Sequence, residues 1–204
     1  MARELREKLR TRMTWMFGFG LACVIFLSRS AWEDHPLVEE SLFLTACLLI
    51  GLGSLGRAWC AVFISGRKDH VLVQKGPYAM SRNPLYFFSF LAATGIGFGT
   101  ETIAIPLFII LSFAIYYPYI IRAEERRLED LFGDDFRQYK SRVPCFFPRW
   151  SLLNGNEPES YEVNTKVLRR ALFDLLWFFW IVGLFELIEA LHAMKIIPVL
   201  FQLY

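Results

Sequence analysis

Residues that bind metal ions or form disulfide bonds are scarce in this sequence. Its 204 residues include four cysteines and three histidines. The cysteines are widely scattered without a CxxC pair, and three of them lie in apolar segments, so we expect packing roles for them. The histidines are equally far apart, which argues against a histidine-based metal site. We therefore expect neither a disulfide framework nor a bound metal.

A large excess of one charge is also absent. The chain carries 22 Lys and Arg against 20 Asp and Glu, which gives a net charge of +2. This balance offers no signal for a nucleic-acid partner. Apolar residues are abundant instead, because 55% of the chain is hydrophobic and 20 residues are Phe. Such a composition is unusual for a soluble domain and indicates a protein whose partner is the lipid bilayer.

Five apolar segments are candidates for membrane-spanning helices, since a helix needs about 20 apolar residues to cross the hydrocarbon core. The basic leader of the first segment resembles that of a signal peptide, but no small-residue cleavage site clearly follows it, so we expect the segment to be retained. The sequence predicts an all-α, polytopic integral membrane protein with about five transmembrane helices. The segments are residues 13–27, 41–64, 84–98, 102–121 and 171–197.

The basic residues predict how these helices are oriented. Five Lys or Arg precede the first segment, and the loop at residues 65–83 and the stretch at 122–165 also carry Lys and Arg. Because cytoplasmic loops are enriched in these residues, we expect a cytoplasmic N-terminus and an external C-terminus. Residues 149–165 are expected to form a polar linker, and residues 166–204 an additional C-terminal transmembrane helix.

The stretch "GLGSLG" has the glycine spacing of a dinucleotide-binding fingerprint, at Gly51, Gly53 and Gly56. That fingerprint requires a preceding strand and a βαβ unit, whereas these glycines lie in an apolar helical segment. We expect them to let neighbouring helices approach closely. Arg57, which follows them, is expected to extend its charge to the membrane surface.

The last apolar segment carries three polar residues on one helix face, Glu186, Glu189 and His192. Their spacing of three predicts an amphipathic face or a contact within the helix bundle. A functional groove is the alternative, since ionisable residues within membrane helices are often functional.

The stretch "GPYAMSRNPLYFF" leads from a turn into an apolar helix. Asn is a favoured N-cap and Pro a favoured first helical residue, so we expect Asn83 and Pro84 to begin this helix. Arg82 then lies beside the helix N-terminus, and the two together would form an anion site. Tyr78 and Tyr86 would provide flat walls for a ring or a sugar. Alternatively, Arg82 reaches the membrane edge and the tyrosines form an interface belt.

A second polar motif, "IIRAEERRLEDLFGDDFRQYKSRVPCFFP", follows the fourth apolar segment. Glu124 and Glu125 lie near its start, and apolar residues recur behind them at helical spacing, so we expect the helix to continue into the cytoplasm. Gly133 should end or bend it. The two carboxylates could form salt bridges with neighbouring arginines or hold a cation against the bilayer. Together with the anion site they would suit a zwitterionic amino-acid group, which S-adenosylmethionine carries beside a sulfonium.

These two motifs resemble the isoprenylcysteine carboxyl methyltransferase family and the related phospholipid N-methyltransferases. The resemblance covers residues 57–148, the methyltransferase-like core of a single membrane domain that spans residues 1–204. It implies an integral-membrane enzyme that uses S-adenosyl-L-methionine, with Arg82 and Glu125 as the candidates for catalysis. The cofactor contacts that it implies are Gly76, Tyr78, Arg82, Asn83, Pro84, Tyr86, Gly95, Gly97, Glu124 and Glu125.

The resemblance assigns Glu124 and Glu125 to the amino group of the cofactor. The sequence departs from the family at Asn83, where histidine is common, and asparagine cannot titrate. His70 is the only histidine near the motifs, so an amine or thiol acceptor has no obvious base, whereas a carboxylate is already ionised at neutral pH. We therefore expect methyl transfer to a lipophilic acceptor, either a small molecule or a lipidated one, with a carboxylate favoured. The alternatives are a membrane NADPH-dependent reductase of the sterol or isoprenoid type and a non-enzymatic membrane scaffold or transporter component.

Overall fold

Helices are the predominant secondary structure of the described residues, which confirms the predicted all-α class. The computed structural model describes residues 20, 22–67, 70–153 and 161–204. Two three-residue strands are the exception. In chain order the elements are β1 (Ser28–Ser30), α2 (Pro36–Ile64), α3 (Pro77–Met80), α4 (Pro84–Phe98), α5 (Ala104–Arg142), the 3-10 helix η1 (Trp150–Leu152), α6 (Thr165–Ala193) and β2 (Phe201–Leu203).

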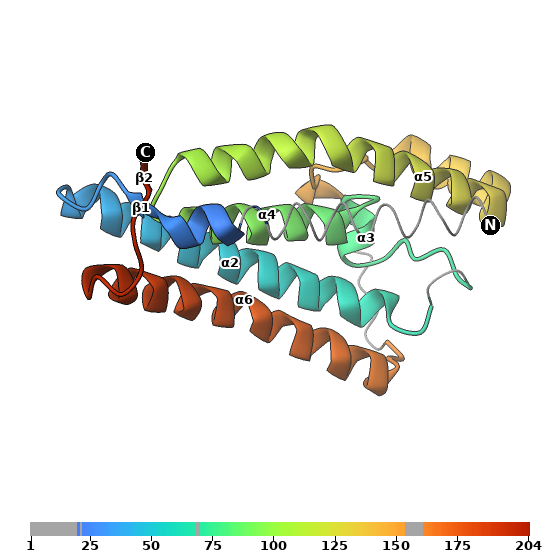
Figure 1. Cartoon of the computed structure of the whole chain (residues 1–204). Coiled ribbons are helices and arrows are strands. Elements are labelled where there is room, and N and C mark those ends of the chain that lie inside the picture. The colour runs from blue at the N-terminus through green and yellow to red at the C-terminus, as the bar shows by residue number, and fades with distance from the viewer. Residues whose placement is uncertain (1–19, 21, 68–69, 154–160) are drawn as a thin grey trace, which may run out of the picture.

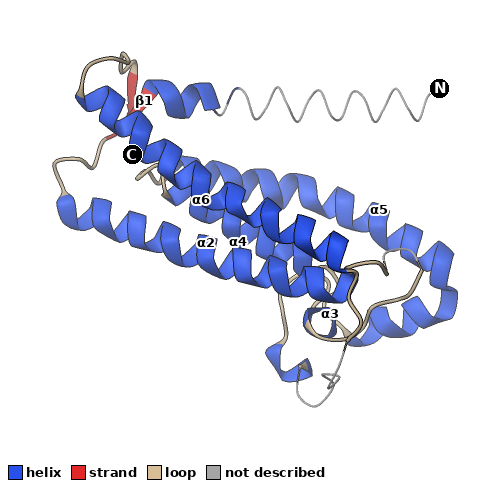
Figure 2. Cartoon of the chain, turned by 90° about the horizontal axis from the view of Figure 1, so that it is seen from below, coloured by secondary structure: helices blue, strands red, loops and turns tan. Residues whose placement is uncertain are grey.

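Helix α4 is the central helix of the bundle. It packs against α2, α5 and α6, and α6 packs against α2 as well. The long helices run side by side along one axis (Figure 1, Figure 2). Helix α3 and the last turns of α5 lie at one end of the bundle and the two strands at the other, so the molecule has two distinct ends.

Small residues bring α2 and α4 into close contact, as the sequence predicted. A Cβ atom added to Gly53 would lie 2.6 Å from the backbone nitrogen of Ala92, and one added to Gly56 would lie 2.0 Å from the ring of Phe88. Any larger side chain at these positions would separate the two helices. Gly51, in contrast, faces open space.

Three described helical segments are long and apolar enough to cross a membrane: Pro36–Ile64, Ala104–Arg142 and Leu168–Ala193. Helix α4 is also apolar but has only 15 residues, or about 22 Å of helix against a hydrocarbon core of about 30 Å. Most of the predicted segment 13–27 lies outside the described residues, although residues 22–27 are helical.

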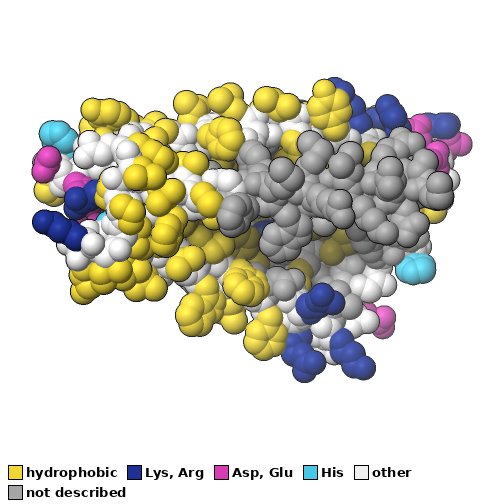
Figure 3. All heavy atoms as spheres, viewed as in Figure 1, with side chains coloured by type: hydrophobic (Ala, Val, Ile, Leu, Met, Phe, Trp, Pro, Cys, Tyr) yellow, Lys and Arg dark blue, Asp and Glu magenta, His cyan; other side chains and the backbone are white. Residues whose placement is uncertain are grey.

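Apolar and basic side chains separate along the bundle. Among the described atoms in Figure 3, hydrophobic side chains cover the half of this face near the strands, and Lys and Arg gather mainly at the opposite end. The basic end carries α3 and the last turns of α5. That this end faces the cytoplasm is still a prediction from the charge pattern.

The C-terminal tail returns to the start of the described chain, which the sequence did not predict. After α6 ends at Ala193, the chain turns at Lys195, whose φ is +58°, and β2 then pairs in parallel with β1. The Tyr204 carbonyl accepts hydrogen bonds from the N–H groups of Ile103 (2.9 Å) and Ala104 (2.7 Å). Helix α6 therefore ends four residues before the predicted segment 171–197 does. The residues after it form a tail that is hydrogen-bonded to β1 and to the start of α5.

Residues 149–165 are the predicted polar linker, of which residues 154–160 lie outside the described structure. The C-terminal part of this segment contacts the end of α2. The Tyr161 hydroxyl donates a hydrogen bond to the Phe63 carbonyl (3.0 Å). The guanidinium carbon of Arg67 lies 3.7 Å from the centre of the Tyr161 ring, a cation–π contact. These contacts fix the approach to α6 beside the end of α2.

Candidate functional site

Arg82 joins the start of α4 to α5. Its Nε donates to Glu125 Oε1 over 2.8 Å, and both side chains are only 10% exposed. Its Nη1 donates to the backbone carbonyls of Lys140 (2.9 Å) and Val143 (2.7 Å). The guanidinium is therefore turned into the protein and does not extend to the membrane edge. Its anionic neighbour is a carboxylate of the same chain.

Asn83 and Pro84 begin α4, as predicted, but the asparagine side chain does not cap the helix. Asn83 Nδ2 donates instead to the Cys145 carbonyl (3.0 Å). The Asn83 carbonyl accepts hydrogen bonds from the N–H groups of Tyr86 (3.1 Å) and Phe87 (3.2 Å). The predicted anion site therefore lacks these two donors, because the first turn of the helix uses them itself.

Helix α5 bends at Gly133, as predicted, and its last turns approach α4. The Gly133 backbone (φ 52°, ψ −122°) is not helical and favours glycine. Beyond the bend, the buried Tyr139 hydroxyl donates to the Tyr78 carbonyl (2.6 Å), and Lys140 Nζ lies 3.4 Å from Glu125 Oε2. Burial raises the pKa of Tyr139 above its ordinary value, so the hydroxyl stays protonated and donates. The bend thus brings the two sequence motifs together.

A pocket of about 120 Å³ opens where the motifs meet. The rest of its wall is mostly apolar and comes from the end of α2, the loop after it, α4 and α5. Six of the predicted cofactor residues line the pocket: Tyr78, Arg82, Asn83, Pro84, Tyr86 and Glu124.

Two polar groups in this wall have no partner among the described residues. Tyr78 is only 7% exposed, and its hydroxyl makes no hydrogen bond. Burial raises the pKa of Tyr78 well above its usual value, so the hydroxyl remains a donor. Glu124, which is half-buried, forms neither a hydrogen bond nor an ion pair there, in contrast to Glu125. Leaving a buried hydroxyl unpaired is unfavourable, so the pocket suits a polar ligand.

The three glycines predicted to contact the cofactor do not line the pocket. A Cβ atom on Gly76 would lie 2.4 Å from a ring of α2, and the φ of this residue is +58°. Cβ atoms on Gly95 and Gly97 would each lie 2.8 Å from the backbone of a neighbouring helix, α2 and α5 respectively. All three positions require glycine for close packing.

Sequence reasoning missed Lys140 and Cys145, which complete the network around Glu125. Cys145 Sγ lies 3.7 Å from Glu125 Oε1. Partial desolvation of the thiol, and then the charge of Glu125, raise the pKa of Cys145 although the residue as a whole is exposed, so the thiol stays protonated. One signal in the sequence indicated that the chain after the bend packs against the bundle, namely the apolar pattern that continues through Phe136 and Tyr139. This pattern did not indicate that Lys140 and Cys145 would lie near Glu125.

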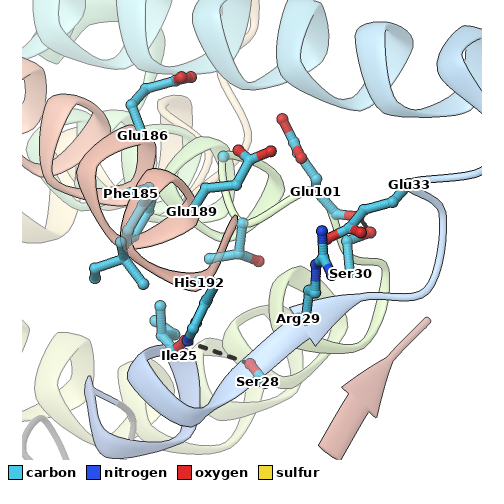
Figure 4. A pocket seen from close by; sticks show the side chains of 13 residues that line it. Ile25, Ser28, Arg29, Ser30, Glu33, Glu101, Phe185, Glu186, Glu189 and His192 are labelled. Carbon is cyan, nitrogen blue, oxygen red and sulfur yellow. Dashed lines mark hydrogen bonds and ion pairs between the residues drawn. The ribbon is translucent and has the colours of Figure 1, made fainter. Parts of the chain in front are cut away.

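A second pocket lies at the opposite end of the bundle, beside β1 (Figure 4). Carboxylate oxygens of Glu39, Glu101 and Glu189 lie within 4.8 Å of one another, and those of Glu101 and Glu189 are neighbours in the close-up. Burial, and then the charges of Glu189 and Glu39, raise the pKa of Glu101 to about 8, so this group holds a proton at neutral pH. His192 Nε2 lies 3.0 Å from the Phe26 carbonyl, which confirms the predicted bundle contact for this histidine.

The chain is similar both to methyltransferases and to metal-resistance proteins. The phospholipid methyltransferase family profile matches residues 40–135. The cobalt-zinc-cadmium resistance protein CzcN of Cupriavidus metallidurans is 37% identical over 174 residues, which are 85% of this chain and 78% of the relative. The nickel-cobalt-cadmium resistance protein NccN of Alcaligenes xylosoxydans xylosoxydans is 35% identical over 85% of this chain and 80% of the relative.

A protein-S-isoprenylcysteine O-methyltransferase, that of Schizosaccharomyces pombe, is 33% identical over 94 residues, 46% of this chain and 40% of the relative. No solved structure matches. The family match contains every pocket-lining residue except Tyr139. The matches point to membrane methyltransferase activity, and methyltransferases of these families use S-adenosylmethionine. The chain therefore belongs to the family of CzcN and NccN, and over part of its length it is similar to the phospholipid and isoprenylcysteine methyltransferases.

Proposed function

We propose that this protein transfers a methyl group from S-adenosylmethionine to a lipid-soluble acceptor at the membrane. The observation that carries the proposal is the pocket between α3, α4 and α5, whose wall holds the carboxylate of Glu124 and the buried hydroxyl of Tyr78, both without a partner among the described residues. A carboxylate suits the amino group of the cofactor, and a hydroxyl suits one of its acceptor atoms. The residues present therefore fit this cofactor.

Arg82 and Glu125 have a different role in this proposal. Nε and Nη1 of Arg82 are occupied by Glu125 and by backbone carbonyls, which leaves Nη2 for the carboxylate of the cofactor. Glu125 then acts as a positioning residue that fixes the guanidinium. The ring of Tyr86 lies edge-on to Tyr117 at 5.3 Å and supplies an aromatic wall for a cationic or planar group.

The cofactor supplies the electrophilic methyl group, and the chain has to align the acceptor and exclude water. The shortness of α4 would allow the acceptor and the cofactor to reach the same pocket. If the end of α4 nearest the strands sits at one membrane boundary, Pro84 begins about 8 Å short of the other boundary. A lipid-soluble acceptor could then reach the pocket from the bilayer, and the water-soluble cofactor from the basic end.

A carboxylate is the acceptor group that this pocket favours. No histidine is among the described residues that line it, and the neighbouring Cys145 and Tyr139 stay protonated. A carboxylate is ionised at neutral pH and needs no base, whereas an amine or a thiol does. Mild alkali should therefore release the transferred label as methanol, which identifies a methyl ester. Label that resists alkali would instead indicate methylation of nitrogen or sulfur.

Ligand binding tests the proposal before any acceptor is known. Titration calorimetry of the full chain in neutral detergent should show binding of S-adenosylhomocysteine, the product form of the cofactor, and no binding of NADPH. The opposite pattern would favour a membrane reductase. Binding of neither nucleotide would favour a scaffold without enzymatic activity.

The similarity to CzcN and NccN suggests a second candidate function, a contribution to resistance against divalent metal ions. A strain that lacks the protein should then grow poorly with cobalt or cadmium. Two variants separate the possible causes in this strain. If resistance requires methyl transfer, Glu124→Gln should fail to restore growth, whereas Glu101→Gln at the other end of the bundle should restore it. Full restoration by Glu124→Gln would separate resistance from the methyltransferase pocket.

A further inference from the structure

Arg57 is a cation inside the helix bundle whose role the cofactor pocket does not explain. Its Nη1 donates a hydrogen bond to the Ser89 hydroxyl of α4, and its guanidinium carbon lies 5.8 Å from the ring centre of Phe178 on α6. Its Nε is buried without a partner. No described carboxylate forms an ion pair with it. The side chain is turned toward α4 and α6, and its reach to the membrane surface stays a prediction.

The depth of Arg57 makes its lack of an ionic partner significant. Helix α2 has 29 residues, about 43 Å, so a centred helix would extend about 7 Å beyond each side of the hydrocarbon core. Arg57 precedes the helix end at Ile64 by about 10 Å. In that placement Arg57 would lie about 3 Å inside the hydrocarbon boundary, close to the level of lipid head groups. Ionisable residues within membrane helices are rare and often mark functional sites.

A second unpaired polar group lies next to it. Ser54 precedes Arg57 by one turn and shares its face of α2. Its side chain is 5% exposed, and its hydroxyl is buried without a partner. Two hydrogen-bond donors are therefore left unused where α2, α4 and α6 meet. On α4, Ser89 is one turn from Leu85 and Tyr86, which both line the cofactor pocket.

We propose that Arg57 and Ser54 bind the anionic group, a carboxylate or a phosphate, of the lipid-soluble molecule that this protein methylates. The inference rests on the proposed methyltransferase function and assigns its acceptor site. A guanidinium is planar, keeps its charge at all pH values and pairs with carboxylates and phosphates through two parallel hydrogen bonds. The Ser54 hydroxyl adds a third donor. The site selects amphiphiles with a negative head group and holds them one helical turn from the cofactor pocket.

The test compares wild type with Arg57→Met and Arg57→Lys in neutral detergent. The probes are oleate, dodecyl phosphate and dodecyltrimethylammonium, and the readouts are thermal stability with increasing probe and calorimetric affinity for S-adenosylhomocysteine. Oleate, dodecyl phosphate or both should stabilise wild type, and the cationic probe should not. Arg57→Met should bind the anionic probe at least about tenfold more weakly, with unchanged affinity for S-adenosylhomocysteine. Arg122→Met, at an exposed arginine of α5, is the matched control and should behave as wild type.

Each outcome decides a different part of the proposal. Stabilisation by oleate alone indicates a carboxylate ligand, and stabilisation by dodecyl phosphate alone a phospholipid-like one. If Arg57→Met does not fold, Arg57→Lys replaces it in the comparison. This variant keeps the positive charge but should still bind the anionic probe more weakly, because an ammonium cannot form the two parallel hydrogen bonds of a guanidinium. Equal stabilisation of wild type and the Arg57 variants, or none of wild type, would overturn the acceptor site. Anion binding that depends on Arg57 in a protein that does not bind S-adenosylhomocysteine would support the site and contradict the methyltransferase function.

Discussion

At the scale of single residues, the two adjacent glutamates of α5 have different surroundings. Glu125 is paired with Arg82 and Lys140, whereas Glu124 faces the pocket and has no partner among the described residues. Glu125 should therefore contribute mainly to stability, and Glu124 mainly to ligand binding. The two effects can be measured separately because the two side chains have different surroundings.

Replacing Glu125 by alanine should destabilise the folded protein. The change leaves Arg82, whose side chain is 10% exposed, without its carboxylate, and breaking a buried ion pair on one side costs about 3–5 kcal/mol. Unfolding in detergent, followed by circular dichroism, measures the loss. The double variant Glu125→Ala/Arg82→Met, which removes both charges, should recover part of it. Wild-type stability of Glu125→Ala would mean that the pair is not buried as described.

Replacing Glu124 by glutamine should weaken ligand binding without affecting stability. The substitution removes a charge-assisted hydrogen bond to the cofactor amino group, worth about 1.5–3 kcal/mol, which corresponds to about 10- to 150-fold in affinity for S-adenosylhomocysteine. Calorimetry measures this affinity. Asp130→Asn, at an exposed carboxylate of the same helix, is the control and should bind as wild type. Equal affinity in the two variants would remove Glu124 from the site.

At the scale of elements, the bend of α5 is what completes the site. It places Tyr139 and Lys140 against α3 and Glu125, and it depends on one residue, Gly133, with a φ of 52°. A straight helix would carry these side chains away from α4.

Gly133→Ala should weaken both the fold and the site. Its backbone conformation is one that L-residues rarely adopt and costs them about 1–3 kcal/mol, although a Cβ atom there would meet no neighbour within 4 Å. The expected result is a lower unfolding temperature together with weaker binding of S-adenosylhomocysteine. Gly183→Ala in α6 is the matched control, because its Cβ also meets nothing within 4 Å but its backbone is helical. If the two variants are equally stable, the bend does not depend on glycine.

Local patterns predicted the elements better than the contacts between them. The Asn83–Pro84 start of α4 and the bend at Gly133 follow from the backbone preferences of single residues, so both could be predicted. The pairing of Arg82 with Glu125 joins residues 43 positions apart, and nothing in the local sequence identifies the partner. For the same reason the β1–β2 pairing was missed, because two three-residue strands have no recognisable periodicity.

At the scale of the whole molecule, the two ends of the bundle carry different chemistry. The basic end holds the proposed cofactor pocket, and the opposite end holds the strands and three close carboxylates, those of Glu39, Glu101 and Glu189. These carboxylates come from α2, from the turn before α5 and from α6. Their protonation therefore affects how the helices are held together at this end.

This carboxylate group predicts a pH dependence of stability. The pKa of Glu101 is about 8 in the folded protein and 4.5 in an unfolded reference. Between these values the folded state keeps a proton that the unfolded chain releases, so stability falls as the pH rises from about 4.5 to 8. Glu101→Gln should reduce this slope and be the more stable protein at pH 8. Unfolding temperatures measured from pH 5 to 8 test this, and parallel curves for the two proteins would contradict it.

The central claim is that this protein, through the pocket lined by Tyr78 and Glu124, transfers methyl groups to a lipid-soluble acceptor at the membrane. The most direct measurement incubates membranes that contain the protein with S-adenosylmethionine labelled on its methyl group and counts the label in the lipid extract. Wild type and Asp130→Asn should label a lipid fraction equally, and Glu124→Gln should label it at least about tenfold less. Lipid label no higher than in membranes without the protein, or label unaffected by Glu124→Gln, would contradict the account.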